Sequence, residues 1–444
     1  MSSVKMRNRR PNTADSNADS TPELKQSKQS QQKTAKGRQP GCRSLLILRT
    51  KRIALLLCTV YISVPVVVYL FPWILGHVIY LHLLRFPFFA DLAIPSEFLN
   101  YTTNFHLSPE EGVSVGVWHT LPVSQWEQAE GRGPEWHRGT LGDGRPVIIY
   151  LHGNTGTRAL SHRVNLVKIL SAAGYHVLSL DYRGYGDSSG EPTEAGLTTD
   201  ALYLYRWVKQ RSRSLVFLWG HSLGTGVTTN VALREQQQGS RVDAVILEAP
   251  YTNMGKAAEC HPISMMYMFI PGFKSLLWKI LEMNNIVFPN DKNLETLACP
   301  VLILHSEDDN VIPHHMGQEL YNIALQAERA RNAGDHVEMV TLPASLGYSH
   351  NYIYMDPSLT TVVGLETLAC PVLILHSEDD NVIPHHMGQE LYNIALQAER
   401  ARNAGGHVEM VTLPASLGYS HNYIYMDPSL TTVVGGFLQR VKQK

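Results

Sequence analysis

The chain has 444 residues, 44% of them hydrophobic, which is enough to bury at least one large core. Its formal net charge is -1, so no overall field attracts nucleic acid, and we expect no nucleic-acid partner. Five cysteines do not make a disulfide framework and leave the redox compartment open.

Residues 1–52 form a polar and strongly basic segment. They carry thirteen Lys or Arg against three acidic residues, and few aliphatic ones. Such a composition buries too little apolar surface to offset the entropy lost on ordering. We therefore predict a disordered basic tail.

An uncharged apolar stretch follows, since Ile53 to Leu84 contains no Asp, Glu, Lys or Arg. About 20 apolar residues suffice to cross a bilayer, so we predict a single transmembrane helix over 53–75. A core helix rarely lacks a polar face over this length, and a signal peptide does not usually follow some fifty polar residues. The basic tail is then cytosolic and everything after the span lumenal or extracellular. A glycosylation sequon at Asn100 agrees with this orientation.

Residues 76–112 are expected to be a membrane-proximal linker, whose aromatic part could lie along the membrane surface. Beyond it, in 113–293, short apolar runs such as 146–151, 176–180 and 215–219 alternate with helical patterns. Strands that alternate with helices of ten to fifteen residues predict an α/β fold with a mostly parallel sheet covered on both faces. We place this domain at 113–364.

The motif Gly220-His221-Ser222-Leu223-Gly224 lies between an apolar strand and a helix rich in small residues. A G-x-S-x-G motif in this context predicts a nucleophile elbow, in which Ser222 sits on a sharp strand-to-helix turn. The helix dipole and the N–H of Leu223 would stabilise an oxyanion there. The glycine-rich loop after the strand 146–151 is the expected source of a second N–H donor, that of Asn154. The same loop could also be an ordinary strand-to-helix turn.

A carboxylate and a histidine are expected to follow the serine in chain order. Asp309 comes in the loop after the apolar strand 301–304, and His350 in the loop after the strand 336–342. A carboxylate so placed can orient an imidazole and stabilise its cation. The sequence thus predicts Ser222, Asp309 and His350 as nucleophile, acid and base.

An internal repeat complicates this assignment. Residues 294–364 recur as 365–435 with an offset of 71, and the copies differ only at Asp335 and Gly406. Near-identity indicates a recent exon duplication or a gene-model error. Asp380 and His421 duplicate the acid–base pair. We favour the first copy, while the second retains the run 436–441 that would complete the last helix.

Residues 252–293 form an apolar insertion, which is either a lid over an acyl pocket or a helical cover of the sheet. No histidine cluster matches a familiar zinc spacing, so we expect no metal and no other cofactor.

Several of these segments resemble those of one family. YLHGNTGTR (150–158), DYRGYGDS (181–188), WGHSLGTGV (219–227), ILHSEDD (303–309) and LGYSHNYIY (346–354) look like the lysophosphatidylserine lipases of the α/β-hydrolase domain-containing protein 12 family. The resemblance implies an α/β-hydrolase fold in the endoplasmic-reticulum membrane, facing the lumen. It also implies lysophosphatidylserine and monoacylglycerols such as 2-arachidonoylglycerol as lipid substrates. An acyl-thioesterase or peptidase of the same fold, or a membrane scaffold disabled by the repeat, are the alternatives.

Overall fold

The computed structural model describes residues 42–332, 336–357, 359, 372–380, 385–389, 392, 393, 396, 408–420, 424–429, 432 and 433. Most of the predicted basic tail and the predicted final helix at 436–441 lie outside the described residues. Two compact units make up the chain, Met1–Ser63 and Val64–Lys444.

A long apolar helix, α1, spans Cys42–Leu70. Its segment Arg49–Leu70 is long and apolar enough to cross a membrane, and none of it is buried in the protein. The helix ends earlier than the predicted boundary at residue 75. Pro72 explains this difference, because proline lacks the N–H that would continue the helix and disfavours helical geometry in the preceding residue. A new helix, α2, then runs over Trp73–Tyr80.

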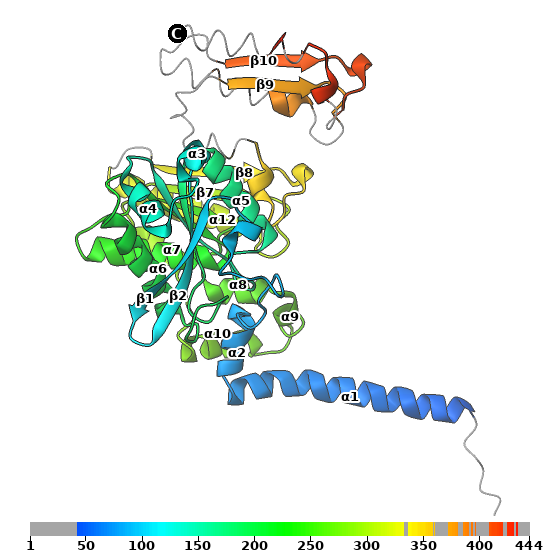
Figure 1. The fold of residues 1–444 in the computed structure, drawn as a ribbon. Helices are drawn as coiled ribbons and strands as arrows, with labels where there is room; N and C mark the ends of the chain where they lie inside the picture. The colour runs from blue at the N-terminus through cyan, green and yellow to red at the C-terminus, as the bar shows by residue number, and fades with distance from the viewer. Residues whose placement is uncertain are drawn as a thin grey trace, which may run out of the picture. The chain divides into compact units, whose positions relative to one another are not determined.

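The second unit is built on one eight-stranded sheet, with the order β1-β2-β4-β3-β5-β6-β7-β8 (Figure 1). Only the β1–β2 and β2–β4 pairs are antiparallel, so the predicted mostly parallel sheet is confirmed. The strands are β1 Thr102–Glu110, β2 Val113–Thr120, β3 Val147–Leu151, β4 His176–Leu180, β5 Val216–His221, β6 Ala244–Glu248, β7 Val301–Ser306 and β8 Val337–Leu342.

Helices cover both faces of this sheet. The longer ones are α5 Ser161–Ala172, α6 Glu194–Lys209, α7 Leu223–Gln237, α10 Phe273–Met283 and α12 His314–Ala330. The shorter ones are α3 Trp126–Ala129, α4 Pro134–Gly139, α8 Met254–Cys260, α9 Pro262–Met265 and α11 Asn290–Thr296. Single 3₁₀ turns are η1 Pro95–Glu97, η2 Val123–Gln125, η3 Thr140–Gly142, η4 Ala344–Leu346 and η5 Ile353–Met355.

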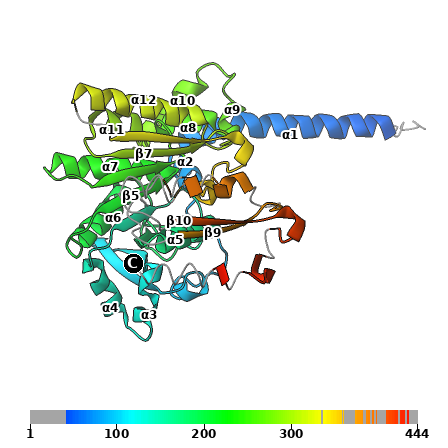
Figure 2. The ribbon, with the colours of Figure 1, turned by 90° about the horizontal axis from the view of Figure 1, so that it is seen from above.

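Two hydrophobic cores result, one on each face. In β3, Ile149 points into the core that α6, α7 and α12 cover, whereas Ile148 points into the core that α5 covers. Figure 2 shows α11 and α12 beside β7. Both faces of β3 are buried, so the strand is a continuous apolar run rather than an alternating one.

The segment before residue 113 belongs to the folded domain, which corrects the prediction of a linker over 76–112. Tyr80, Leu92, Leu99 and Leu107 are buried in the two cores. β1 pairs with β2 along most of its length, so the boundary predicted at residue 113 falls inside a hairpin. These apolar residues cover the sheet. Their spacing in the sequence alone did not indicate that they belong to the folded domain.

The second repeat copy forms a two-stranded parallel sheet of its own, from β9 (Val372–Ser377) and β10 (Val408–Leu413). Short 3₁₀ turns follow at η7 Ala415–Leu417 and η8 Ile424–Met426. Its register repeats that of β7 and β8 in the first copy. Only the first copy completes the eight-stranded sheet, because β7 pairs with β6.

Candidate active site

Ser222 lies where β5 ends and α7 begins, with φ 51° and ψ -118°. This left-handed conformation is strained for a non-glycine residue and is typical of functional turns. A Cβ at Gly220 would overlap the carbonyl oxygen of Gly224, and one at Gly224 would overlap that of Leu151. The glycine spacing of the motif therefore follows from close backbone packing around the serine.

Replacing Gly224 by alanine is expected to lower the free energy of unfolding by about 3 kcal/mol and to remove activity. The new methyl group would meet backbone, which cannot rotate away. Chemical denaturation of Gly224→Ala and of Gly133→Ala checks this. Gly133 has open space around its Cβ position and no positive φ, so its alanine variant should match the wild type. Equal stability of both variants would contradict the packing argument.

The loop 152–156 lies against Ser222. A Cβ on Gly153 would lie 3.1 Å from Cβ of Ser222. The N–H groups of Thr155 and Gly156 donate to the carbonyls of Tyr80 and Leu84, at 3.2 and 2.8 Å. Among the described residues, no acceptor is bonded to the N–H of Asn154 or to that of Leu223, the first residue of α7. These are the two predicted oxyanion donors.

The predicted acid and base of the first copy are in contact. His350 Nδ1 lies 2.8 Å from Asp309 Oδ2, although 41 residues separate them in the chain. Asp309 Oδ1 also accepts hydrogen bonds from the N–H groups of Val311 and Ile312, both at 2.8 Å. Burial alone would raise the pKa of Asp309, but hydrogen bonds from His305 and His350 hold it well below its usual value. Asp309 is therefore a carboxylate at neutral pH.

His305 is a second partner of this carboxylate that the sequence did not reveal. Its Nε2 lies 3.3 Å from Asp309 Oδ2 and 3.0 Å from the carbonyl oxygen of Ile312. The sequence alone predicts an ordinary packed or surface histidine at this position, because it lies at the end of a regular element. Its position four residues before the acid was the available signal.

His350 is held beside the elbow through His221. Nε2 of His221 donates to the carbonyl oxygen of His350 at 2.9 Å, and their ring centroids are 4.9 Å apart. Burial keeps the pKa of His221 well below its ordinary value, so this ring is neutral. Within the described residues Ser222 Oγ makes no hydrogen bond to His350. Such bonds often tighten only when the substrate binds.

The residues of the second copy are placed differently. Asp380 follows β9, outside the sheet that carries Ser222, and its Oδ2 lies 3.5 Å from Nε2 of His376. His421 lies outside the described residues.

Glu248 is a buried carboxyl group at the end of β6, paired in register with His221. Its Oε2 accepts a hydrogen bond from Nε1 of Trp219 at 2.8 Å, yet burial raises its pKa to about 7. The unfolded chain releases this proton near pH 4.5 and the folded chain near 7. Stability from this group is therefore complete below pH 4.5 and is lost as pH rises to 7.

Glu248→Gln is accordingly expected to raise the free energy of unfolding at pH 8 by about 3 kcal/mol, and to leave it unchanged near pH 4. Urea titrations of both proteins across this range measure the difference. A gain that does not depend on pH would show that the effect is packing rather than ionisation.

One group of possible metal ligands occurs in the described residues. Atoms of His77, His82 and Glu191 all lie within 4.8 Å of one another. The group shares no residue with the Ser222 site. Acyl transfer by serine, histidine and aspartate uses protein groups only.

A strained serine after the central strand, an N–H-lined loop and a buried Asp–His pair define a hydrolase of the α/β-hydrolase fold. The sequence profile described as "alpha/beta hydrolase fold" matches residues 146–283. The chain is 45% identical to the lysophosphatidylserine lipase ABHD12 of Danio rerio over 72% of its own length and 83% of the relative's. It is 48% identical to protein ABHD12B of Homo sapiens over 64% of its length and 78% of the relative's. The chain belongs to the ABHD12 family.

Among solved structures, the chain is similar to the esterase Pf2001 of Pyrococcus furiosus. The two are 19% identical, with a TM-score of 0.43, over 61% of this chain and 93% of that one.

Proposed function

We propose that this chain hydrolyses acyl esters of lysophospholipids, lysophosphatidylserine above all, and of monoacylglycerols, through an acyl-enzyme on Ser222. The observation that carries the proposal is the 2.8 Å contact of His350 with Asp309 in a sheet whose elbow presents Ser222. Relatives named lysophosphatidylserine lipase support the substrate class.

In this mechanism Nε2 of His350 accepts the proton of Ser222 Oγ as the oxygen attacks the ester carbonyl. The imidazolium is stabilised by Asp309, which stays ionised. The N–H groups of Asn154 and Leu223 hold the negative oxygen of the tetrahedral intermediate. His350 then gives its proton to the leaving alcohol. A water molecule, deprotonated by the same histidine, releases the fatty acid.

The first repeat copy supplies the acid and base in this proposal. β7 pairs with β6 and β8 pairs with β7, so the loops that carry Asp309 and His350 leave the same sheet as Ser222. One strand position beside β6 accommodates one copy, and the second copy pairs with itself instead.

A substrate panel tests the function. Membranes that contain the full chain are given lysophosphatidylserine, lysophosphatidylcholine, a monoacylglycerol, an acyl thioester and a peptide amide, with Ser222→Ala membranes as the blank. Serine-dependent release of fatty acid from lysophosphatidylserine and monoacylglycerol is expected. Preference for the thioester or the amide would favour the other hydrolase activities, and no turnover of any substrate would favour a disabled scaffold.

The insertion 252–293 is proposed to be a lid over the acyl site. It consists of α8 to α11, and several of its apolar side chains face solvent, although others such as Leu277 and Ile280 are buried. Those at least one third exposed are Ile263, Met265, Met266, Phe269, Trp278, Met283 and Val287. Phe269 is 75% exposed. Together with its exposed apolar neighbours it forms an apolar surface in contact with water, which is typical of a lipid-binding or protein-binding site.

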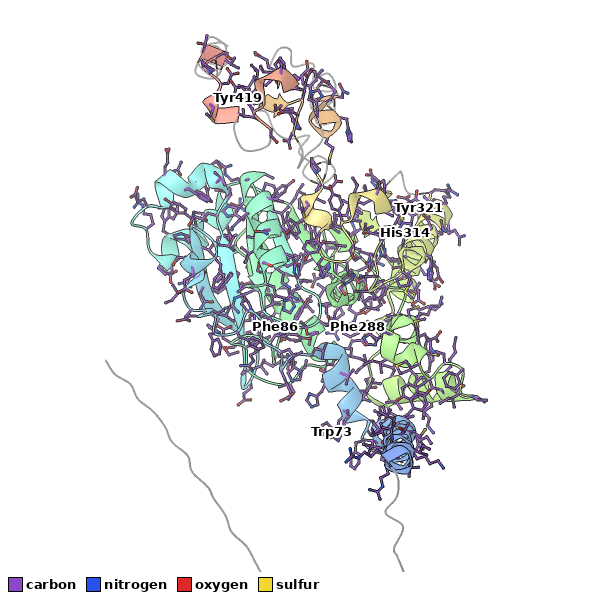
Figure 3. The ribbon with its side chains drawn as sticks, turned by 90° about the vertical axis from the view of Figure 1, so that its right-hand side faces the viewer. Trp73, Phe86, Phe288, His314, Tyr321 and Tyr419 are labelled. Atoms are coloured by element: carbon purple, nitrogen blue, oxygen red, sulfur yellow. The ribbon has the colours of Figure 1, made fainter. Side chains whose placement is uncertain are left out.

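This lid lies beside the residues that follow α1. Nδ2 of Asn284, just after α10, donates to the carbonyl oxygen of Pro72 at 2.9 Å. Trp73 at the start of α2 (Figure 3) is exposed, whereas Tyr80 at the other end of the helix is buried according to its exposed fraction of 2%. If α1 spans the bilayer, the apolar lid is therefore close to the membrane surface, where lipid substrates reside.

Met266→Asp together with Phe269→Asp is expected to lower kcat/KM for long-chain lysophospholipids by at least about ten-fold, because two charges oppose entry into lipid. Hydrolysis of a short soluble ester should change little. Leu215→Asp is the matched control, since Leu215 is 56% exposed just before β5, at the end of that strand opposite Ser222. Equal loss with both substrates would count against the lid.

The proposed location is the endoplasmic-reticulum membrane, with one span, a cytosolic basic tail and a lumenal catalytic domain. The support is the candidate span and the exposure of Asn100 in the turn before β1. A mobility shift on deglycosylation that is lost in Asn100→Gln would place this residue in the lumen. An unshifted band would argue for the opposite topology.

A further inference from the structure

Arg163 is a buried arginine in the first turn of α5, only 2% exposed. A cation at a helix N-terminus opposes the helix dipole, so this position does not by itself favour an arginine. Within the described residues it forms no ion pair, and its nearby carboxylate, Asp181, is bonded to Arg158 at 2.6 Å. Its buried Nε has no hydrogen-bond partner. Burial lowers the pKa of Arg163, but an arginine stays charged at neutral pH.

The guanidinium binds carbonyl oxygens of the oxyanion loop instead. Nη2 donates to those of Gly153, Asn154 and Thr155, at 3.3, 3.2 and 2.8 Å. Nη1 donates to that of Thr157 at 3.0 Å. Three successive carbonyls of the loop thus converge on one buried nitrogen.

Because each peptide unit is planar, the hydrogen bonds to these carbonyls also determine the direction of the N–H groups in the same units. The carbonyl of Gly153 and the N–H of Asn154 belong to one planar trans unit, so they point in opposite directions. Arg163 and His152, whose Nδ1 lies 2.6 Å from the same Gly153 oxygen, therefore together fix the direction of the Asn154 N–H. The following units obey the same rule, since the N–H groups of Thr155 and Gly156 bond away from the guanidinium, to Tyr80 and Leu84.

The loop needs such a restraint. Thr155 and Gly156 both have positive φ, at 60° and 66°. For threonine this conformation is strained and persists only where the surroundings impose it. Without Arg163, the carbonyls of Asn154 and Thr155 would lose the side-chain donor bonded to them, whereas that of Gly153 would keep Nδ1 of His152 at 2.6 Å.

We propose that Arg163 is a positioning residue for the oxyanion hole, which acts by fixing the peptide that presents the N–H of Asn154 to Ser222. The inference rests on the proposed function in that it assumes an oxyanion formed at Ser222. It makes no assumption about which ester is cleaved.

The test measures two quantities in the full chain in membranes: the rate at which a fluorophosphonate labels Ser222, and kcat and KM for an ester. Arg163→Met keeps the length of the stem and removes the donors. It is expected to lower the labelling rate and kcat by about 10- to 100-fold with less than about a three-fold change in KM. Arg163→Lys is expected to remain at least about ten-fold slow, because one ammonium cannot reproduce the planar fork.

Arg163→Ala, which leaves a cavity, is expected to regain activity when ethylguanidinium is added, but not with urea. Arg206→Met is the control. Arg206 pairs with Glu235 at 2.7 Å on the outside of α6, and its loss should change neither rate.

Wild-type labelling rates in Arg163→Met or Arg163→Lys would overturn the proposal. A second result would also overturn it. If activity falls in every variant in parallel with the melting temperature, and ethylguanidinium does not rescue Arg163→Ala, then the role of Arg163 is structural alone. Labelling does not depend on the natural lipid. A wild-type chain that labels but leaves lysophosphatidylserine intact would therefore overturn the proposed substrate and not this inference.

Discussion

Ser222→Ala is expected to reduce ester hydrolysis by about 10⁶-fold and to abolish fluorophosphonate labelling. The reason is that in the proposed mechanism every covalent step runs through Oγ of this residue, and neither His350 nor water replaces it as the attacking atom. The fold should persist, because Ser222 Oγ forms no hydrogen bond within the part of the chain that the structure describes, and the backbone N–H of Ser222 still donates to the carbonyl of Glu248 at 2.9 Å.

The measurement is fluorophosphonate labelling of membranes beside kcat from fatty-acid release. Ser212→Ala is a suitable control, since Ser212 is also a buried serine but lies in the turn between α6 and β5. Persistent labelling in Ser222→Ala would show that another residue is the nucleophile. Unlabelled wild-type protein that is well expressed would indicate a disabled site.

Asp309→Asn is expected to lower kcat by about 10⁴-fold, whereas Asp380→Asn should leave it unchanged. The asparagine amide can reach Nδ1 of His350, but it favours the wrong tautomer and provides no charge for the imidazolium. Asp309 is within 2.8 Å of His350, whereas Asp380 follows a strand outside the main sheet. The two substitutions are chemically identical and lie in identical sequence, so each is the matched control of the other.

Steady-state kinetics on purified full-length variants decides between the copies. The opposite pattern, with Asp380→Asn inactive, would assign catalysis to the second copy. Equal partial losses would mean that both copies compete for the place beside β6.

Much of the fold could be predicted from the sequence, because it depends on interactions between residues that are close together in the chain. The apolar run at β3 predicts a strand buried on both faces, and the strand was found within one residue of its predicted start. Glycines at 220 and 224 predict the elbow, because only a residue without a side chain fits against the backbone there. The order of residues in the chain and their positions in loops then predicted Asp309 and His350 as the acid and the base.

Other features depend on contacts between distant segments. Residues 76–112 read as a linker because their apolar side chains are scattered, and only the sheet shows what they cover. Arg163 has no sequence signal for its contacts, and His305 has only its spacing of four residues from Asp309, since these contacts depend on where a side chain points after packing.

The repeat shows most clearly which features the sequence determines and which depend on the tertiary structure. By itself, the sequence determined the strand pattern, the elbow and two equivalent candidate pairs, Asp309 with His350 and Asp380 with His421. It gave only a preference for the first pair, which follows directly from the preceding helical region, because copies with the same residues have the same local preferences. The tertiary structure decided which copy joins the sheet. The edge of β6 offers one ladder of backbone hydrogen bonds, and β7 of the first copy occupies it.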